Sequence, residues 1–328
     1  MDSKEHGMEI TPGIHRIEAP LGDRFVAMHL LVGDVAALLF DTGMDQMPYE
    51  YILPYLEQIG LSPSKIRYVL TSHADFDHSA GNASIREIVP DAIFMCHHLD
   101  QPMVEDIEVM IRDRYGEFAA DHDIDESDES KAFIRAQSRH VHMNITVSGG
   151  EYIRLGRDWT VEVLHTPGHS RGHLTLHDPH SQTLIICDAT LWNAVLRKDG
   201  TPAFPPTYRY TDTYVASMNR FAGMNVQTLL TSHYPIYTGA RVHEFLAESR
   251  AYVDRVDQAL LQELADASGP RTMRELITAL SPKLGEWPEA AGVYLVFPLS
   301  GHLERLVQYG RVEIGRRGRL MTYTLKKA

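Results

Sequence analysis

The stretch His73-Ala74-Asp75-Phe76-Asp77-His78 decides the fold prediction, because it places four potential metal ligands within six residues. It directly follows residues 68–72, whose β-branched and aromatic content predicts a buried strand. Loops at strand ends often carry the functional residues of a protein. Imidazole and carboxylate groups bind zinc, iron or manganese when several of them converge within about 2.0–2.2 Å of the ion. Asp and His are also common in turns, but four within six residues favour a metal site over an ordinary turn.

Three further candidate ligands lie downstream, each just past a strand-like segment. His169 belongs to the turn His165–Ser170, Asp188 follows the apolar run Leu184–Cys187, and His233 follows residues 229–232. Taken alone, each of these residues would be an ordinary turn or capping residue. Their occurrence together with the first stretch favours a shared role as ligands.

This combination resembles the metallo-β-lactamase superfamily. Its members carry a His-x-His-x-Asp-His motif, then a His in a Thr-Pro-Gly-His turn, then an Asp and a further His. The resemblance covers roughly residues 8–240 and includes residues 39–43, Leu-Phe-Asp-Thr-Gly, which are similar to the family's early strand and turn. It implies an α/β fold, the αββα sandwich of the superfamily. It also implies two divalent metal ions, with seven ligands: His73, Asp75 and His169 on the first ion, Asp77, His78 and His233 on the second, and Asp188 between them.

One position departs from the family pattern, since Asp75 stands where most members have a second His. A carboxylate is a harder ligand than imidazole and carries charge, which favours iron or manganese over zinc. Asp is also shorter than His, so one alternative is that Asp75 does not reach the ion and one metal is weak or absent. The identity of the metal, zinc, iron or manganese, therefore stays open.

Length and composition set the class of protein. The chain has 328 residues, of which 44% are hydrophobic, enough for one large domain and a smaller one. No apolar run approaches the roughly 18 residues of a membrane helix, and no signal-like N-terminus is visible. Cys96 and Cys187 are too few for a disulfide framework. We therefore expect a soluble, cytoplasmic protein without a membrane partner.

The charge of the chain argues against nucleic-acid binding over its whole surface. The formal net charge is −13, whereas phosphate contacts need clustered Lys and Arg. Residues 298–328 are an exception, because they hold seven Lys and Arg but only two Asp and Glu. This basic tail is either a solvated face or the binding site of its own partner.

The pattern along the chain predicts two domains. We expect residues 1–250 to form the catalytic domain, with a polar, helix-prone insertion at about 101–147. The insertion either caps the active site, with Tyr115 and Phe118 lining it, or forms a plain solvated helical pair. Residues 251–328 form the second domain.

The second domain is predicted to contain helices and a hairpin. One helix begins at 272–277, another spans Leu299–Tyr309, and strands at 311–314 and 320–324 flank a turn at 315–318. This order resembles the small winged-helix domain at the C-terminus of some superfamily members, including a ribonuclease branch. Apart from a role in binding RNA, this domain could mediate formation of a homodimer or form one wall of the substrate cleft.

The resemblance implies a hydrolytic mechanism. Water between two metal ions is deprotonated near neutral pH and attacks an electrophilic carbonyl or phosphorus. Asp77 would orient this hydroxide. Tyr208 or Tyr210 would donate to the oxyanion, the alternative being ordinary loop packing. His165 and His173 are expected to hydrogen-bond around the ligands without binding metal.

Three functions remain open at this point. The first is a metal-dependent hydrolase acting on a small-molecule ester, thioester or lactone, favoured by the ligand set and by the lack of a strong nucleic-acid signature. The second is a ribonuclease that uses the basic tail to hold RNA. The third is a binding or regulatory protein in which Asp75 has impaired one metal site.

Overall fold

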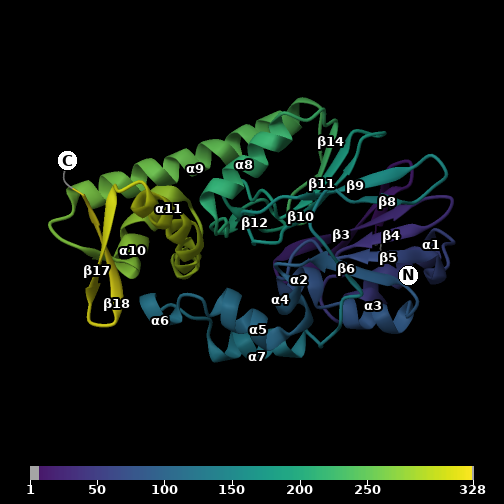
Figure 1. The fold of residues 1–328 in the computed structure, drawn as a ribbon, viewed down its shortest axis with the longest axis horizontal. Helices are drawn as coiled ribbons and strands as arrows, with labels where there is room; N and C mark the ends of the chain where they lie inside the picture. The colour runs from purple at the N-terminus through teal and green to yellow at the C-terminus, as the bar shows by residue number, and fades with distance from the viewer. Residues whose placement is uncertain (1–6, 327–328) are drawn as a thin grey trace.

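Two β-sheets pack face to face and carry helices on their outer faces in the computed structural model, which describes residues 7–326 (Figure 1). This arrangement is the predicted αββα sandwich. The first sheet keeps its strands in chain order. Its members are β1 (Gly7–Thr11), β2 (Ile14–Leu21), β3 (Arg24–Val32), β4 (Ala37–Phe40), β5 (Ile66–Leu70), β6 (Ile93–His97) and β7 (Ile145–Val147).

The second sheet has the order β15-β14-β11-β10-β9-β8. Most of its neighbours are antiparallel, but β11 and β14 run parallel, so their carboxyl ends meet at the same edge. Its members are β8 (Tyr152–Arg154), β9 (Thr160–His165), β10 (Leu174–Asp178), β11 (Thr183–Cys187), β14 (Thr228–Thr231) and β15 (Tyr237–Thr238). A separate ribbon pairs β12 (Val195–Leu196) with β13 (Pro202–Phe204).

Alternation of side chains along the strands explains the layers. In β4, Leu38 and Phe40 face the second sheet, whereas Leu39 faces the helices of the first. In β11, Ile185 faces the first sheet and Ile186 faces the opposite way. Strands that are buried on both faces read as continuous apolar runs, which is why these segments were recognisable in the sequence.

The outer faces of the sandwich are covered by helices. The first sheet packs against η1 (Pro48–Ile52), α1 (Leu53–Gln58) and α3 (Asn82–Ile88), and η2 (Pro63–Lys65) precedes β5. The second sheet packs against α8 (Thr211–Ala222) and the start of α9 (Ala240–Asp266). None of the helices between residues 7 and 326 combines the length and the apolar composition needed to span a membrane.

Five short helices follow β6, in the segment predicted as an insertion. Their bounds are α4 (Gln101–Glu105), α5 (Ile107–Met110), η3 (Ile111–Tyr115), α6 (Ala119–His122) and α7 (Asp128–Ala136). The helices end at Ala136, and β7 returns to the first sheet at Ile145. Figure 1 shows α5, α6 and α7 extending from the sandwich toward the C-terminal hairpin.

The C-terminal elements form a second hydrophobic cluster around a small sheet of order β16-β18-β17. They are β16 (Arg271–Thr272), α10 (Met273–Leu284), η4 (Glu289–Leu295), α11 (Val296–Gln308), β17 (Val312–Arg317) and β18 (Leu320–Leu325). The expected boundary after residue 250 falls inside α9, which packs on the second sheet at Phe245 and in the C-terminal cluster at Val256. The division into domains stays a prediction.

The hairpin is longer than predicted. Residues 315–317, expected in the turn, pair with β18, and the register Arg317 to Leu320 leaves a loop of Gly318 and Arg319. Gly318 has a φ of +63°, which suits a two-residue hairpin loop. The sequence Gly315-Arg316-Arg317-Gly318 does not show where strand pairing ends. The prediction that the turn begins at residue 315 was therefore wrong.

His29 in β3 makes the stability of the fold dependent on pH. Its ring is fully buried, and neither ring nitrogen has a hydrogen-bond partner among the residues that the structure describes. Burial together with the charge of Arg16 lowers its pKa to about 3. Below about pH 6.5 the unfolded chain therefore binds a proton here that the folded chain does not, and stability falls with pH. We expect His29→Leu to reduce the loss of unfolding free energy between about pH 7.5 and about pH 4.5 by roughly 2–3 kcal/mol in urea titrations. An unchanged difference between the two pH values would contradict this explanation.

Candidate metal centre

The first four predicted ligands lie where β5 passes into a short helix. His73 follows the strand, Asp75 immediately precedes α2 (Phe76–Ser79), and Asp77 and His78 lie within α2. The short connection of residues 71–75 and the first turn of α2 together place these side chains at the edge of the sandwich. All of them are buried except Asp75, whose side chain is 14% exposed.

The other three predicted ligands come from the second sheet. Asp188 directly follows β11, His233 lies two residues beyond β14, and His169 lies in the connection between β9 and β10. The parallel pairing of β11 and β14 places Asp188 and His233 at the same edge. The structure thus brings all seven predicted ligands together in three overlapping groups: His73 with Asp75 and His169, His73 with His78 and Asp188, and Asp77 with His78 and His233.

Unusual backbone conformations occur at the strand ends beside this cluster. Asp41 and Cys187, the residue before Asp188, have φ angles of +64° and +44°. Such left-handed conformations are costly for residues other than Gly and concentrate at functional sites. Gly168, before His169, has a φ of +154°, and a Cβ there would lie 2.5 Å from the Cα of Tyr214. The Thr-Pro-Gly-His turn therefore requires Gly at this position.

One set of ligands has the spacing of a tetrahedral metal site. The Nε2 atom of His233 lies 3.3 Å from Asp188 Oδ2 and 3.6 Å from Asp77 Oδ2. His78 Nε2 lies 3.7 Å from Asp188 Oδ2 and 3.8 Å from Asp77 Oδ2. Ligands about 2.1 Å from a tetrahedral ion are about 3.4 Å apart, so these four imidazole–carboxylate distances suit residues that share a divalent ion.

Hydrogen bonds orient both imidazoles of this set. The Nδ1 of His78 lies 2.9 Å from Asp41 Oδ2, and the Nδ1 of His233 lies 2.9 Å from the carbonyl oxygen of Phe25. Each Nδ1–H donates to its oxygen, which directs Nε2 into the cluster. His78 Nε2 and Asp188 Oδ1 are buried, and neither has a hydrogen-bond partner among residues 7–326. Such orphaned atoms are expected of groups that bind a metal.

The charges of this set favour a cation between the ligands. Burial lowers the pKa of His78, but the carboxylates of Asp77, Asp188 and Asp41 outweigh it and raise the pKa to about 10. Burial raises the pKa of Asp188, but His233 and His78 hold it well below its usual range. A divalent ion would take over the positive charge that the proton on His78 supplies.

The remaining ligands have a different environment. His169 Nε2 lies 2.9 Å from Asp75 Oδ2, and the guanidinium of Arg114 donates to both carboxylate oxygens of Asp75, from Nε at 3.0 Å and Nη2 at 3.2 Å. His73 donates from Nδ1 to Ser72 Oγ, and its Nε2 has no hydrogen-bond partner in the described part of the chain. Burial raises the pKa of Asp75, but Arg114 and His169 hold it well below its usual range. Burial and the charge of Arg114 lower the pKa of His169 to about 4, so its imidazole is neutral.

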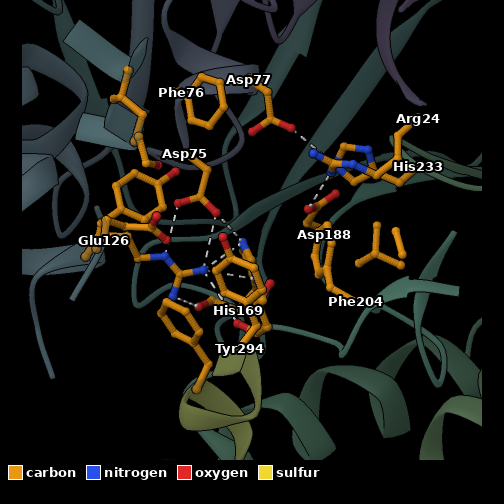
Figure 2. Close-up of a pocket in the computed structure, with 18 of the residues that line it drawn as sticks. Arg24, Asp75, Phe76, Asp77, Glu126, His169, Asp188, Phe204, His233 and Tyr294 are labelled. Atoms are coloured by element: carbon orange, nitrogen blue, oxygen red, sulfur yellow. Dashed lines mark hydrogen bonds and ion pairs between the residues drawn. The ribbon is translucent and has the colours of Figure 1, made fainter. Parts of the chain in front are cut away.

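Five of the seven predicted ligands line a cleft of about 390 Å³: Asp75, Asp77, His169, Asp188 and His233. Figure 2 shows Asp75 and His169 on one side of it and Asp77, Asp188 and His233 on the other. Its walls combine aromatic and charged side chains and come from the sandwich, the insertion and the C-terminal segment. The aromatic lining residues are Phe76, Tyr115, Phe133, Phe204, Tyr294 and Phe297. Of the two lining residues predicted in the insertion, Tyr115 lies in the cleft, whereas Phe118 is buried against Phe297.

The two predicted tyrosine donors do not line this cleft. Tyr208 is fully buried, and its hydroxyl donates to His302 Nε2 at 2.8 Å, while His302 Nδ1 donates to Asp257 at 2.6 Å. The hydroxyl of Tyr210 accepts a hydrogen bond from Arg171. This geometry favours the alternative of loop packing for both tyrosines.

Removing the Tyr208 hydroxyl is therefore expected to affect stability more than activity. Tyr208→Phe leaves the buried His302 Nε2 unpaired, which costs about 1–3 kcal/mol of unfolding free energy. We expect kcat to change by less than about threefold, since loss of an oxyanion donor costs about 10²–10³-fold. Tyr309→Phe, at an exposed position, is the matched control. A hundredfold loss of kcat in the folded Tyr208→Phe variant would restore the role as donor.

His173 lies beside the ligands, whereas His165 stacks on the ring of His97 away from them. His173 stacks on the ring of His73 at 5.0 Å, and its Nδ1 lies 3.2 Å from Thr166 Oγ1. His165 Nε2 donates to the carbonyl oxygen of Arg171. Neither residue belongs to a possible ligand group among the described residues.

Two residues of the site have roles that no local sequence signal reveals. Asp41 appears in the sequence only as part of a turn, yet it is fully buried and accepts hydrogen bonds from Ser72 N and Oγ as well as from His78. Arg114 lies in the insertion, far along the chain from Asp75. Only the three-dimensional structure brings these pairs together.

The comparisons with known proteins agree with this architecture. The family model described as the metallo-beta-lactamase superfamily matches residues 21–233. A metallo-beta-lactamase family protein from Thermus thermophilus has a similar structure, with a TM-score of 0.74, 20% identity and coverage of 97% of this chain and 100% of that chain. A beta-lactamase domain protein from Burkholderia ambifaria has a TM-score of 0.75 at 17% identity, covering 98% of this chain and 93% of that one. These two similarities concern the fold, and they extend into the C-terminal segment.

A curated relative matches a shorter part of the chain. It is a cytoplasmic hydroxyacylglutathione hydrolase from Arabidopsis thaliana, 29% identical over 114 residues. The match spans 35% of this chain and 30% of that relative.

Proposed function

Because the chain belongs to the metallo-β-lactamase superfamily, we propose that it is a metal-dependent hydrolase acting on a small ester, thioester or lactone. The observation that carries this proposal is the convergence of Asp77, His78, Asp188 and His233 at the spacing of a tetrahedral metal site. Two imidazoles and two carboxylates suit zinc, iron or manganese. The open cleft above them gives a substrate access to the ion.

The residues of the cleft have distinct roles in this proposal. A bound divalent ion would activate water and polarise the substrate's carbonyl oxygen. Asp77 is placed to accept a hydrogen bond from the attacking water and so to orient it. Asp41 and the Phe25 carbonyl hold the imidazoles of His78 and His233 in position.

The walls of the cleft favour a small substrate with an apolar portion. Aromatic rings from three parts of the chain would exclude water around an acyl or leaving group. Arg24 also lines the cleft, with its guanidinium 4.8 Å from the centre of the Phe204 ring and no hydrogen bond or ion pair to another described residue. This cation would suit a substrate that carries a carboxylate. The named substrate of the Arabidopsis relative, an acyl derivative of glutathione, is of this chemical kind.

The ion pairs of the basic residues in the C-terminal hairpin argue against the ribonuclease alternative. Arg316 and Arg317 form ion pairs with Asp121 and Glu275, and Arg319 pairs with Asp123. Guanidinium groups that already face carboxylates are poorly placed to contact phosphates. These pairs instead connect the hairpin to α6, the loop after it and α10.

A substrate panel tests the proposal. Metal-loaded protein would be assayed with simple aryl esters, an acyl glutathione thioester, lactones and an unstructured RNA. We expect hydrolysis of at least one ester, thioester or lactone, and none of the RNA. Cleavage of RNA alone would favour the ribonuclease, and folded, metal-loaded protein inactive on the whole panel would favour the binding or regulatory protein.

A further inference from the structure

We propose that the guanidinium of Arg114 takes the place of the first metal ion, so that the protein binds a single divalent ion at Asp77, His78, Asp188 and His233. This inference rests on the proposed metal site and specifies how many ions it holds. It differs from the two-ion site that the sequence motif implies. The reasons are the geometry around Asp75 and the way in which Arg114 is held.

At the predicted site of the first ion, the ligand atoms of Asp75 and His169 contact each other and the guanidinium of Arg114. Asp75 Oδ2 and His169 Nε2 are 2.9 Å apart, a hydrogen-bonding distance, whereas the four imidazole–carboxylate distances in the other set are 3.3–3.8 Å. Arg114 Nη2 lies 3.1 Å from His169 Nε2 and 3.2 Å from Asp75 Oδ2. The guanidinium therefore occupies the space in which an ion would contact both ligands.

The pairing of Arg114 with Asp75 is two-pronged. Nε faces Asp75 Oδ1 at 3.0 Å, and Nη2 faces Oδ2 at 3.2 Å. Paired donors of this kind match the planar shape of a carboxylate and are the strong form of the interaction. The carboxylate that a first ion would need is thereby neutralised by a charge that the protein itself supplies.

Other contacts fix Arg114 in this position. Nη1 donates to the carbonyl oxygen of His169 at 3.3 Å, and Nη2 lies 3.5 Å from the carbonyl oxygen of Thr207. The ring of Phe297 packs against the guanidinium, with 4.5 Å between the ring centre and Arg114 Cζ. The side chain is 7% exposed. Contacts from the turn at His169, the loop at Thr207 and α11 thus hold the group, and an ion would have to displace all of them.

The distribution of buried atoms without hydrogen-bond partners supports a single bound ion. Within the described residues, His78 Nε2 and Asp188 Oδ1 lack hydrogen-bond partners, whereas both Asp75 oxygens and His169 Nε2 have them. His73 Nε2 also lacks a partner and belongs to a possible ligand group with His78 and Asp188, so it faces the second set as well as the first. Arg114 lines the cleft, where its fixed charge faces the substrate beside the ion.

Metal counting tests the inference directly. Folded wild-type protein would be depleted of metal, saturated with Mn²⁺, freed of excess ion and analysed for manganese per chain, with an electron paramagnetic resonance spectrum of the same sample. We expect about one ion per chain and the hyperfine spectrum of an isolated Mn²⁺. Arg114→Met, which keeps bulk but removes the charge and the donors, is expected to bind about two ions, with the spectrum of a coupled pair.

Arg112→Met is the matched control, because Arg112 is mostly exposed and pairs with Asp113 outside the cluster. It should keep about one ion. Two ions in the wild type, or one ion in folded Arg114→Met, would overturn the inference. If that variant does not fold, the wild-type count and spectrum still decide. One ion per chain without hydrolysis would contradict only the proposed function. Two ions per chain with hydrolysis would contradict only the one-ion inference. No ion in folded protein would contradict both.

Discussion

Replacing His233 by alanine is expected to abolish hydrolysis. Its Nε2 lies within 3.6 Å of both Asp77 Oδ2 and Asp188 Oδ2, so the variant leaves these carboxylates without one of the imidazoles that would share their ion. We expect metal affinity to fall below detection in calorimetric titrations and kcat/KM to fall at least about 10³-fold. His233 follows β14 and lies outside the strand, so the fold should persist.

His243→Ala is the control for this experiment, since His243 is exposed on α9. It should retain metal and activity. A His233→Ala variant that is folded, binds the ion normally and hydrolyses substrate at the wild-type rate would show that the proposed ligand set is wrong.

Asp41→Ala is expected to impair both stability and metal binding. The carboxylate is fully buried, accepts two hydrogen bonds from Ser72 and orients His78. Burial raises its pKa, but His78 and Ser72 outweigh this and leave the pKa below its usual value, so the group is ionised in the folded protein. Removing it leaves the buried donors unpaired, and we expect a loss of about 3–5 kcal/mol of unfolding free energy.

The same change should weaken metal binding by about 10–100-fold, because His78 is no longer held by its Nδ1. Urea titrations and calorimetry measure the two effects separately. Asp91→Asn, at an exposed position, should change neither. If Asp41→Ala lowered stability but left metal affinity intact, Asp41 would be part of the strand–turn structure and not a positioning residue for His78.

The sandwich was predicted from the family resemblance, and the motifs that carry this resemblance are local features of the sequence. Buried strands such as β4 and β11 are continuous apolar runs. Asp41 directly follows β4 and Asp188 directly follows β11, so the change from apolar to acidic residues shows where each strand ends. The Gly168-His169 pair marks a turn whose backbone leaves no room for a Cβ. These signals are local, and local signals survive in a single sequence.

The partners of the ligands were not predictable in this way. Arg114 and Asp75 are 39 positions apart, and Arg114 lies in a segment of short helices whose polar composition resembles that of any solvated surface. Tyr208 was a plausible donor in an aromatic loop until its hydroxyl was found on His302, 94 positions away. Whether a polar residue faces the cleft or the interior depends on tertiary packing, which neither composition nor spacing encodes.

The central claim is that this chain hydrolyses its substrate with a metal ion held by its own histidines and aspartates. The most direct measurement is the rate on a responsive ester or thioester before metal removal, after removal and after Mn²⁺ or Zn²⁺ is returned to the same folded sample. We expect the rate to fall at least about a hundredfold when the metal is removed and to recover when it is returned. Folded, metal-free protein that hydrolyses the substrate at the original rate would contradict it.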